Sequence, residues 1–190
     1  MDLDNAQLYR YKQECPIPPT LPTGPKHLRF LRLLRGAGDS QIECELTISK
    51  AEDEKYEAVS WCWGREARTK TIKILDKDRN PTLKFLVSPN LEAALKCLRK
   101  DAVPRVLWID AICINQDDFE ERSEQVPLMA QIYGQATNVC VWLGAGDPSS
   151  NRAITFIKER VLRLESFDKL VQDNSTASEW MAVNTLMMKP

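Results

Sequence analysis

Residues 107–144 read LWIDAICINQDDFEERSEQVPLMAQIYGQATNVCVWLG, and this stretch decides the fold. It begins with an apolar run, 106–109, that predicts a buried strand, and it closes with a second apolar run, 139–143. A segment of mixed character between them predicts a helix, so the stretch reads as a βαβ unit. Open α/β sheets bind ligands where a strand ends before a helix, so the polar residues after Ile109 mark the expected site.

Length and composition limit the class of protein. A chain of 190 residues suits one domain with a small appendage. Its 26 basic and 27 acidic side chains leave a net charge of −1, which argues against a nucleic-acid surface. No apolar run approaches the ~20 residues of a membrane span, and the acidic N-terminus lacks the apolar core of a signal peptide. We therefore expect a cytoplasmic protein that binds neither nucleic acid nor membrane.

The six cysteines are scattered, form no CxxC pair and are accompanied by one histidine, His27. Zinc sites need clustered ligands, so the sequence predicts no metal site. Four cysteines lie in apolar runs, and we expect reduced, unpaired thiols in the core. Whether Cys113 is such a core thiol is left open, because it lies beside the polar cluster. The remaining five cysteines are Cys15, Cys44, Cys62, Cys97 and Cys140.

The chain divides into three predicted parts. Residues 1–25 hold five prolines and predict an extended arm. Residues 26–146 form the core domain, and residues 147–190 a helical extension that we expect to continue into a longer protein. Two pairs of strand-like runs flank turn-rich segments and predict β-hairpins, and a further strand follows the first pair. The pairs are 28–34 with 41–48 and 71–75 with 83–87, and the single strand is 57–63.

Three helices are expected. Ser88 and Pro89 start the first. Asp118 with Glu121, or Asp117 with Glu120, could cap the second, in which Pro127 implies either a late start or a kink. The second helix is predicted to bury Val126, Met129, Ile132, Tyr133 and Ala136. The third, 150–164, is predicted to present Ile154, Ile157, Val161 and Leu164 on one face.

Ser60-Trp61-Cys62-Trp63-Gly64 ends a strand and is the first candidate for a ligand site. Trp61 and Trp63 point the same way on a strand, so both indoles face one environment. They could wall a small flat ligand, although core packing is the commoner role of a tryptophan, with Gly64 as a turn residue.

Asp110 has two open interpretations. A carboxylate after a buried strand needs hydrogen-bonding partners. These are either the backbone amides of a neighbouring loop or a ligand hydroxyl.

Acidic and amide side chains, among them Asn115, Gln116, Glu121 and Arg122, follow Asp110. Acids at a helix start are favoured by capping and by the helix dipole, and Glu121 with Arg122 could be a plain surface pair. A carboxylate here could instead hydrogen-bond a sugar hydroxyl or stabilise an oxocarbenium-like centre. The sequence has neither a GxGxxG nor a P-loop motif, and one histidine makes a His-based catalytic triad improbable.

Several blocks, in order over about residues 28–146, resemble the fungal heterokaryon incompatibility (HET) domain. They are YEAVSWCWG at 56–64, VSPNL at 87–91, LWIDAICINQ at 107–116, Glu121-Arg122, and VWLG at 141–144. The family usually has tyrosine where this chain has Trp61, which exchanges one aromatic residue for another.

The resemblance implies a role in fungal nonself recognition, in which incompatible fusion triggers programmed cell death. HET domains are thought to be remotely similar to TIR domains, which implies an α/β fold with a flavodoxin-like parallel sheet flanked by helices. The predicted hairpins would then be N-terminal additions. Some TIR domains cleave NAD through a helix-borne glutamate, and others only self-associate as signalling scaffolds.

Two hypotheses follow from the resemblance. In the first, the domain is an NAD glycohydrolase with NAD as substrate, no resident cofactor and Glu121 as the catalytic acid. Glu121→Ala would then abolish killing and cost only about 1 kcal/mol of stability, the size of a lost cap. The expected ligand-binding set is Ser60, Trp61, Trp63, Gly64, Asp110, Asn115, Gln116 and Arg122. In the second, the domain is a non-catalytic module that binds copies of itself and other cell-death or NLR-type signalling proteins.

Overall fold

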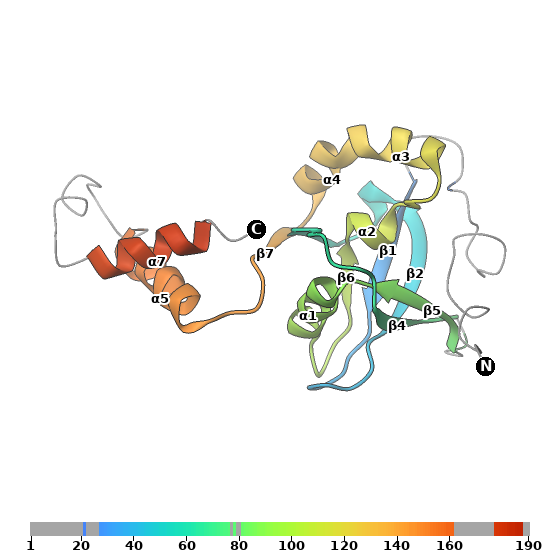
Figure 1. Ribbon diagram of the computed structural model, residues 1–190. Coiled ribbons are helices and arrows are strands. Elements are labelled where there is room, and N and C mark those ends of the chain that lie inside the picture. The colour runs from blue at the N-terminus through green and yellow to red at the C-terminus, as the bar shows by residue number, and fades with distance from the viewer. Residues whose placement is uncertain (1–20, 22–26, 77, 79–80, 162–176, 188–190) are drawn as a thin grey trace. The chain divides into compact units, whose positions relative to one another are not determined.

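The computed structural model (Figure 1) describes residues 21, 27–76, 78, 81–161 and 177–187. The chain divides into two compact units, residues 1–142 and 143–190. Apart from Leu21, the predicted proline-rich arm lies outside the described residues. No helix within the described ranges is long and apolar enough to cross a membrane.

The first unit is built on a seven-stranded sheet with the spatial order β5-β4-β2-β1-β6-β3-β7. The strands are β1 (His27–Leu33), β2 (Glu43–Lys50), β3 (Glu57–Trp61), β4 (Lys70–Leu75), β5 (Pro81–Val87), β6 (Arg105–Trp108) and β7 (Asn138–Trp142). β3 is parallel to both β6 and β7, and β2 is parallel to β4. The pairs β1–β2, β1–β6 and β4–β5 are antiparallel. The sheet is therefore mixed, and the expectation of a parallel sheet holds for only part of it, because each predicted hairpin is antiparallel within itself and β1 also pairs antiparallel with β6.

The parallel part of the sheet is the βαβ unit predicted from residues 107–144. β6 lies between β1 and β3, and β7 lies at the edge. The register pairs Ala58 with Trp108 on one side and Val59 with Cys140 on the other. The prediction that Val59, Ile109 and Val141 belong to adjacent parallel strands is confirmed, with Ile109 directly after β6.

Helices cover both faces of this sheet. They are α1 (Pro89–Leu98), α2 (Asp110–Cys113), α3 (Phe119–Gln125) and α4 (Met129–Gln135), with short 3-10 turns η1 (Ala51–Asp53) and η2 (Val126–Leu128). Arg105 and Trp108 point to opposite faces of β6, because they are an odd number of residues apart. Arg105 Nη1 donates to Leu98 O at the end of α1, at 2.7 Å. The Trp108 ring packs edge-on against Tyr133 of α4, with centroids 5.7 Å apart. α1 and α4 therefore lie on opposite faces.

The predicted start of α1 is confirmed. The Ser88 Oγ accepts a hydrogen bond from Leu91 N at 3.2 Å, and Pro89 occupies the first helical position. Leu91, Ala94 and Leu95 are buried, as the helical spacing requires.

Pro127 interrupts the second predicted helix. α3 and α4 are separated by η2, since proline cannot donate the helical hydrogen bond and disturbs the preceding turn. Val126 lies in this turn and is 53% exposed, so its predicted burial is wrong. Ile132 is fully buried as expected, and Met129, Tyr133 and Ala136 pack partly buried against the core.

The five described cysteines are free thiols. Cys44 and Cys113 are buried, and burial raises the pKa of the Cys113 thiol to about 12. Cys62 and Cys97 are exposed, contrary to the expectation of core thiols. Cys62 is exposed because Trp61 and Trp63, on either side of it, are the residues that turn toward Asp110. Cys97 lies on the solvent-facing side of α1.

The second unit contains α5 (Pro148–Phe156), a π-helical turn η3 (Ile157–Val161) and α7 (Ala177–Met187). Ala153, Ala182 and Leu186 form its buried cluster, and the Phe156 and Trp180 rings meet edge-on at 5.2 Å. The predicted apolar face is thus shifted. Ile154 is only partly buried beside the cluster, and the π-turn holds Ile157 and Val161 outside it, at intermediate exposure. Leu164 lies outside the described residues.

Candidate functional site

The carboxyl ends of three parallel strands bring their polar and aromatic residues together. Trp61 ends β3, Asp110 follows β6 by two residues, and Trp142 ends β7. This edge of a parallel sheet is where α/β folds place ligands. The residues here are held by a network of side-chain hydrogen bonds.

Asp110 is the centre of that network. Its Oδ1 accepts hydrogen bonds from Trp61 Nε1 at 2.9 Å and from Ala111 N at 2.7 Å, and its Oδ2 accepts from Trp63 Nε1 at 2.8 Å. The two indoles are stacked, with centroids 5.7 Å apart and planes 22° apart. The prediction that both tryptophans face one environment is confirmed. The carboxylate already accepts hydrogen bonds from three N–H donors, so it is suited to positioning the indoles.

Gln116 supports the same centre from the next loop. Its Nε2 donates to Asp110 O at 2.9 Å.

Tyr133 donates a hydrogen bond from its hydroxyl to Val59 O at 3.0 Å. Burial, and to a smaller extent the Asp110 charge, raises the pKa of Tyr133. The tyrosine is therefore kept neutral.

Asn90, in the first turn of α1, ties the loop after β3 to the end of β7. Its Nδ2 donates to Cys62 O at 2.9 Å, and its Oδ1 accepts from Trp142 Nε1 at 2.8 Å. The Asn90 backbone N–H donates to Glu66 Oε2 at 3.3 Å, which places a carboxylate at the positive end of the helix dipole. Gly64 allows the chain to turn between these contacts, with a φ of 62° that other residues rarely adopt.

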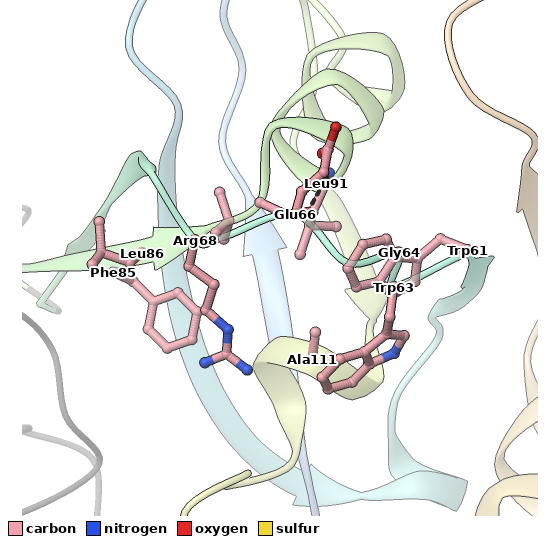
Figure 2. Close-up of a pocket in the computed structure, with 11 residues that line it drawn as sticks. Trp61, Trp63, Gly64, Glu66, Arg68, Phe85, Leu86, Leu91 and Ala111 are labelled. Carbon is pink, nitrogen blue, oxygen red and sulfur yellow. Dashed lines mark hydrogen bonds between the residues drawn. The ribbon is translucent and has the colours of Figure 1, made fainter. Parts of the chain in front are cut away.

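A small hollow lies beside this network. Trp61, Trp63 and Gly64 line it together with Glu66, Arg68, Phe85 of β5, the helix cap Ser88 and Leu91 of α1 (Figure 2). Its volume is about 90 Å³, well below the roughly 300–1,000 Å³ of common ligand pockets. The walls are aromatic and apolar, and the rim carries one acidic and one basic side chain.

Glu121 belongs to a different structure. Its Oε1 accepts from Arg29 Nη1 and from Asn115 N, both at 2.7 Å, and its Oε2 accepts from Arg29 Nη2 at 3.1 Å. Arg29 also donates to Cys113 O at 2.8 Å. The side chains of Arg29 and Glu121 are 1% and 6% exposed. This buried, bidentate ion pair connects α3 and the loop before it to β1.

The start of α3 is set by Asp118, whose Oδ1 accepts from Glu121 N at 3.1 Å. Of the two capping pairs that the sequence allowed, the structure has the one with Asp118. Arg122 does not pair with Glu121. It is exposed, and its guanidinium lies over the Phe119 ring at 5.9 Å.

The structure thus divides the predicted site residues into two groups. Trp61, Trp63 and Gly64 line the hollow. Asp110 positions the two indoles, and Gln116 is hydrogen-bonded to Asp110. Ser60, Asn115, Glu121 and Arg122 are not among the residues that line it. Ser60 lies within β3, paired with Val141 in register. Asn115 is buried, and its backbone N–H donates to Glu121 Oε1.

Sequence reasoning missed Arg29, Glu66, Arg68, Asn90 and Trp142 as parts of these arrangements. Asn90 and Trp142 stand in the quoted blocks of the resemblance, so that signal could have marked them. Arg29 carried a different signal, because it is a charged residue between the apolar residues Leu28 and Phe30. Across the described part of the chain, no group of three or more His, Cys, Asp or Glu side chains could hold a metal ion.

Comparison with known proteins identifies the class. A family model described as "Heterokaryon incompatibility protein (HET)" matches residues 56–189, so the chain belongs to the HET family. Over 170 residues it is 34% identical to "Heterokaryon incompatibility protein 6, OR allele" of Neurospora crassa. That alignment covers 85% of this chain and 25% of the relative, so the chain spans about a quarter of the relative's length. No solved structure matches.

Proposed function

We propose that this domain is the death-inducing part of a fungal nonself-recognition protein and that it acts in the cytoplasm. Membership of the HET family is the observation that carries the proposal, supported by the incompatibility protein to which the chain is similar. The chain corresponds to one quarter of that relative, so further segments of a longer protein would supply recognition.

Self-association is the mode of action that the geometry favours. β7 is one of the two edge strands of the described sheet, and its Val139 and Val141 are 41% and 63% exposed. Both side chains lie on the same face of the strand. An apolar edge strand with unpaired backbone groups is a template for pairing with another chain. A second copy can offer the same edge around a two-fold axis, which gives a self-complementary interface. Assembled copies would then recruit other cell-death or NLR-type signalling proteins.

A TIR-like cleavage of NAD is the second candidate. The aromatic hollow beside the carboxyl ends of β6, β3 and β7 favours it, because Trp63 could stack on the nicotinamide ring. It ranks second because both oxygens of Glu121 are already bound by Arg29 and Asn115 N. Incubation of the purified protein with NAD, followed by measurement of released nicotinamide, tests this candidate directly.

The assembly proposal is tested with Val141→Lys, which places a charge on the apolar edge. Val103→Lys is the matched control, since Val103 is 51% exposed in a loop before β6. We expect Val141→Lys to remain folded, to reduce self-association in light scattering and to lose killing in a fungal expression assay. Val103→Lys should retain both properties. Full killing by a monomeric Val141→Lys protein would contradict assembly through β7.

A further inference from the structure

The hollow between the β3–β4 loop and the start of α1 has the features of a binding site in its own right. Its floor includes Phe85, which is 4% exposed, and its wall includes Trp63, which is 39% exposed. Figure 2 shows the Trp63 ring beside Ala111 and the Arg68 side chain reaching toward the same place. An aromatic surface and a cation are therefore presented together.

The aromatic wall is rigid before any ligand arrives. Asp110 fixes Trp63 through a hydrogen bond of 2.8 Å to its indole N–H, and Trp61 is stacked on it. A ring held in this way loses little conformational entropy when another ring stacks on it. An exposed tryptophan with a fixed ring is thus preorganised for an aromatic ligand.

The charged side chains at the rim determine which charge a bound ligand should carry. Arg68 is exposed, and within the described part of the chain no hydrogen bond or ion pair engages its guanidinium. Glu66, the other charged residue of the lining, is directed to the start of α1, where its Oε2 accepts from Asn90 N. In Figure 2 the Glu66 carboxylate and the Arg68 guanidinium lie on opposite sides of the hollow. A guanidinium pairs best with a carboxylate or phosphate, which it can bind through two N–H groups.

We propose that this hollow binds a monocyclic aromatic anion, with the ring stacked on Trp63 and the anionic group paired with Arg68. Its volume of about 90 Å³ is smaller than the roughly 150 Å³ cavity that encloses benzene. The site therefore takes one ring with an edge in solvent and excludes fused ring systems. The ligand is either a free aromatic acid or the base and phosphate of a pyrimidine nucleotide. The proposal does not depend on NAD cleavage or on assembly through β7.

Isothermal titration of the full chain tests the proposal with two series of probes. Benzoate is compared with benzamide, which lacks the charge, and with acetate, which lacks the ring. Uridine monophosphate is compared with uridine and with ribose 5-phosphate. If the ligand is an aromatic acid, benzoate should bind at least about tenfold more tightly than benzamide and acetate. If it is a pyrimidine nucleotide, uridine monophosphate should bind at least about tenfold more tightly than uridine and ribose 5-phosphate.

Arg68→Gln should weaken the preferred probe by about tenfold or more. Arg65→Gln, a change of an exposed arginine in the same loop that does not line the hollow, should leave affinity unchanged. Absence of binding by both anionic aromatic probes at millimolar concentration would overturn the proposal. Equal binding by Arg68→Gln, or equal binding of benzamide or ribose 5-phosphate, would overturn it as well. Killing and self-association are measured separately, so failure here leaves the proposed function untouched.

Discussion

Asp110 and Glu121 are both acidic residues that follow the same buried strand, yet the structure gives them different surroundings. Asp110 holds two indoles beside a solvent-accessible hollow. Glu121 holds a buried arginine and a backbone N–H, and it does not line that hollow. One carboxylate shapes a surface that a ligand can reach, whereas the other fastens a loop and a helix to the sheet.

Arg29 causes the difference. It lies in β1, which is antiparallel to β6, so its side chain reaches the segment that follows β6. A helix-start acid is normally exposed, but here a partner 92 residues away draws Glu121 into the core. The hypothesis that makes Glu121 the catalytic acid of a site that includes Asp110 overlooked this partner.

The largest effect is expected for Glu121→Ala. Removing one partner of a buried ion pair leaves Arg29 with an uncompensated charge, which typically costs about 3–5 kcal/mol. This value exceeds the roughly 1 kcal/mol expected of a lost cap. Chemical denaturation should therefore show a much lower free energy of unfolding, and loss of killing by this variant would reflect unfolding rather than missing catalysis.

Two further variants sharpen this test. Glu120→Ala removes an exposed neighbouring acid and should change stability by at most about 0.5 kcal/mol. The double change Arg29→Met with Glu121→Met removes both charges and should recover much of the loss, since well-packed apolar residues can replace a buried pair. A folded, killing-competent double variant would exclude Glu121 as a catalytic acid. A cost near 1 kcal/mol for Glu121→Ala would contradict the proposed role of the ion pair.

Asp110→Asn should have the next largest effect. The amide loses the charge and offers N–H groups to one of the indoles, so at least one charge-assisted hydrogen bond is lost, at about 1.5–3 kcal/mol. We also expect a shift in tryptophan fluorescence, because Trp61 and Trp63 lose their fixed positions. Asp117→Asn, at an exposed position in the next loop, is the control and should change neither. An unchanged spectrum would show that Asp110 does not hold the indoles.

Local signals predicted much of the fold, and contacts between distant residues explain most of what was missed. The two hairpins, the parallel strands of the βαβ unit and the Ser88 cap follow from spacing within a few residues. The antiparallel insertion of β1 beside β6 does not, because no local pattern states which strands become neighbours. The wall of the hollow was predictable from the spacing of Trp61 and Trp63. Arg68 and Asn90 were missed because their roles appear only once β5 and α1 are packed beside the loop.

Asp118→Ala separates the helix cap from the ion pair. The change removes the acceptor of Glu121 N, so we expect a loss of about 1 kcal/mol, the usual size of an N-cap. The Arg29–Glu121 pair should remain, because the Glu121 carboxylate binds Arg29 and Asn115 N, whereas Asp118 binds only the backbone N–H of Glu121. Hydrogen exchange should show faster opening confined to the first turn of α3. A loss as large as that of Glu121→Ala would mean that cap and ion pair form one cooperative unit.

The smallest effect is expected at Glu57, which pairs with Arg105 in a more exposed version of the Arg29–Glu121 arrangement. The Arg105 Nε donates to Glu57 Oε2 at 2.7 Å, and the Glu57 side chain is 25% exposed. This hydrogen bond lowers the pKa of Glu57 from its ordinary value of 4.5, against the opposing effect of burial. Because the folded-state pKa is below the unfolded one, the stabilisation is fully present above pH 4.5 and is lost as the pH falls through the lowered pKa.

Glu57→Gln should therefore cost at most about 1 kcal/mol at neutral pH, as expected of a partly solvated pair. The difference between the two proteins should shrink as the pH falls below 4.5, because the native carboxyl takes up its proton at its lowered pKa. Urea denaturation at neutral pH and along an acid series below pH 4.5 measures this change. Glu43→Gln is the control, because Glu43 lies 3.8 Å from Lys73 at a more exposed pair and should contribute little. A difference that grows in acid would reverse the sign of the argument and show that Arg105 does not stabilise the ionised form of Glu57.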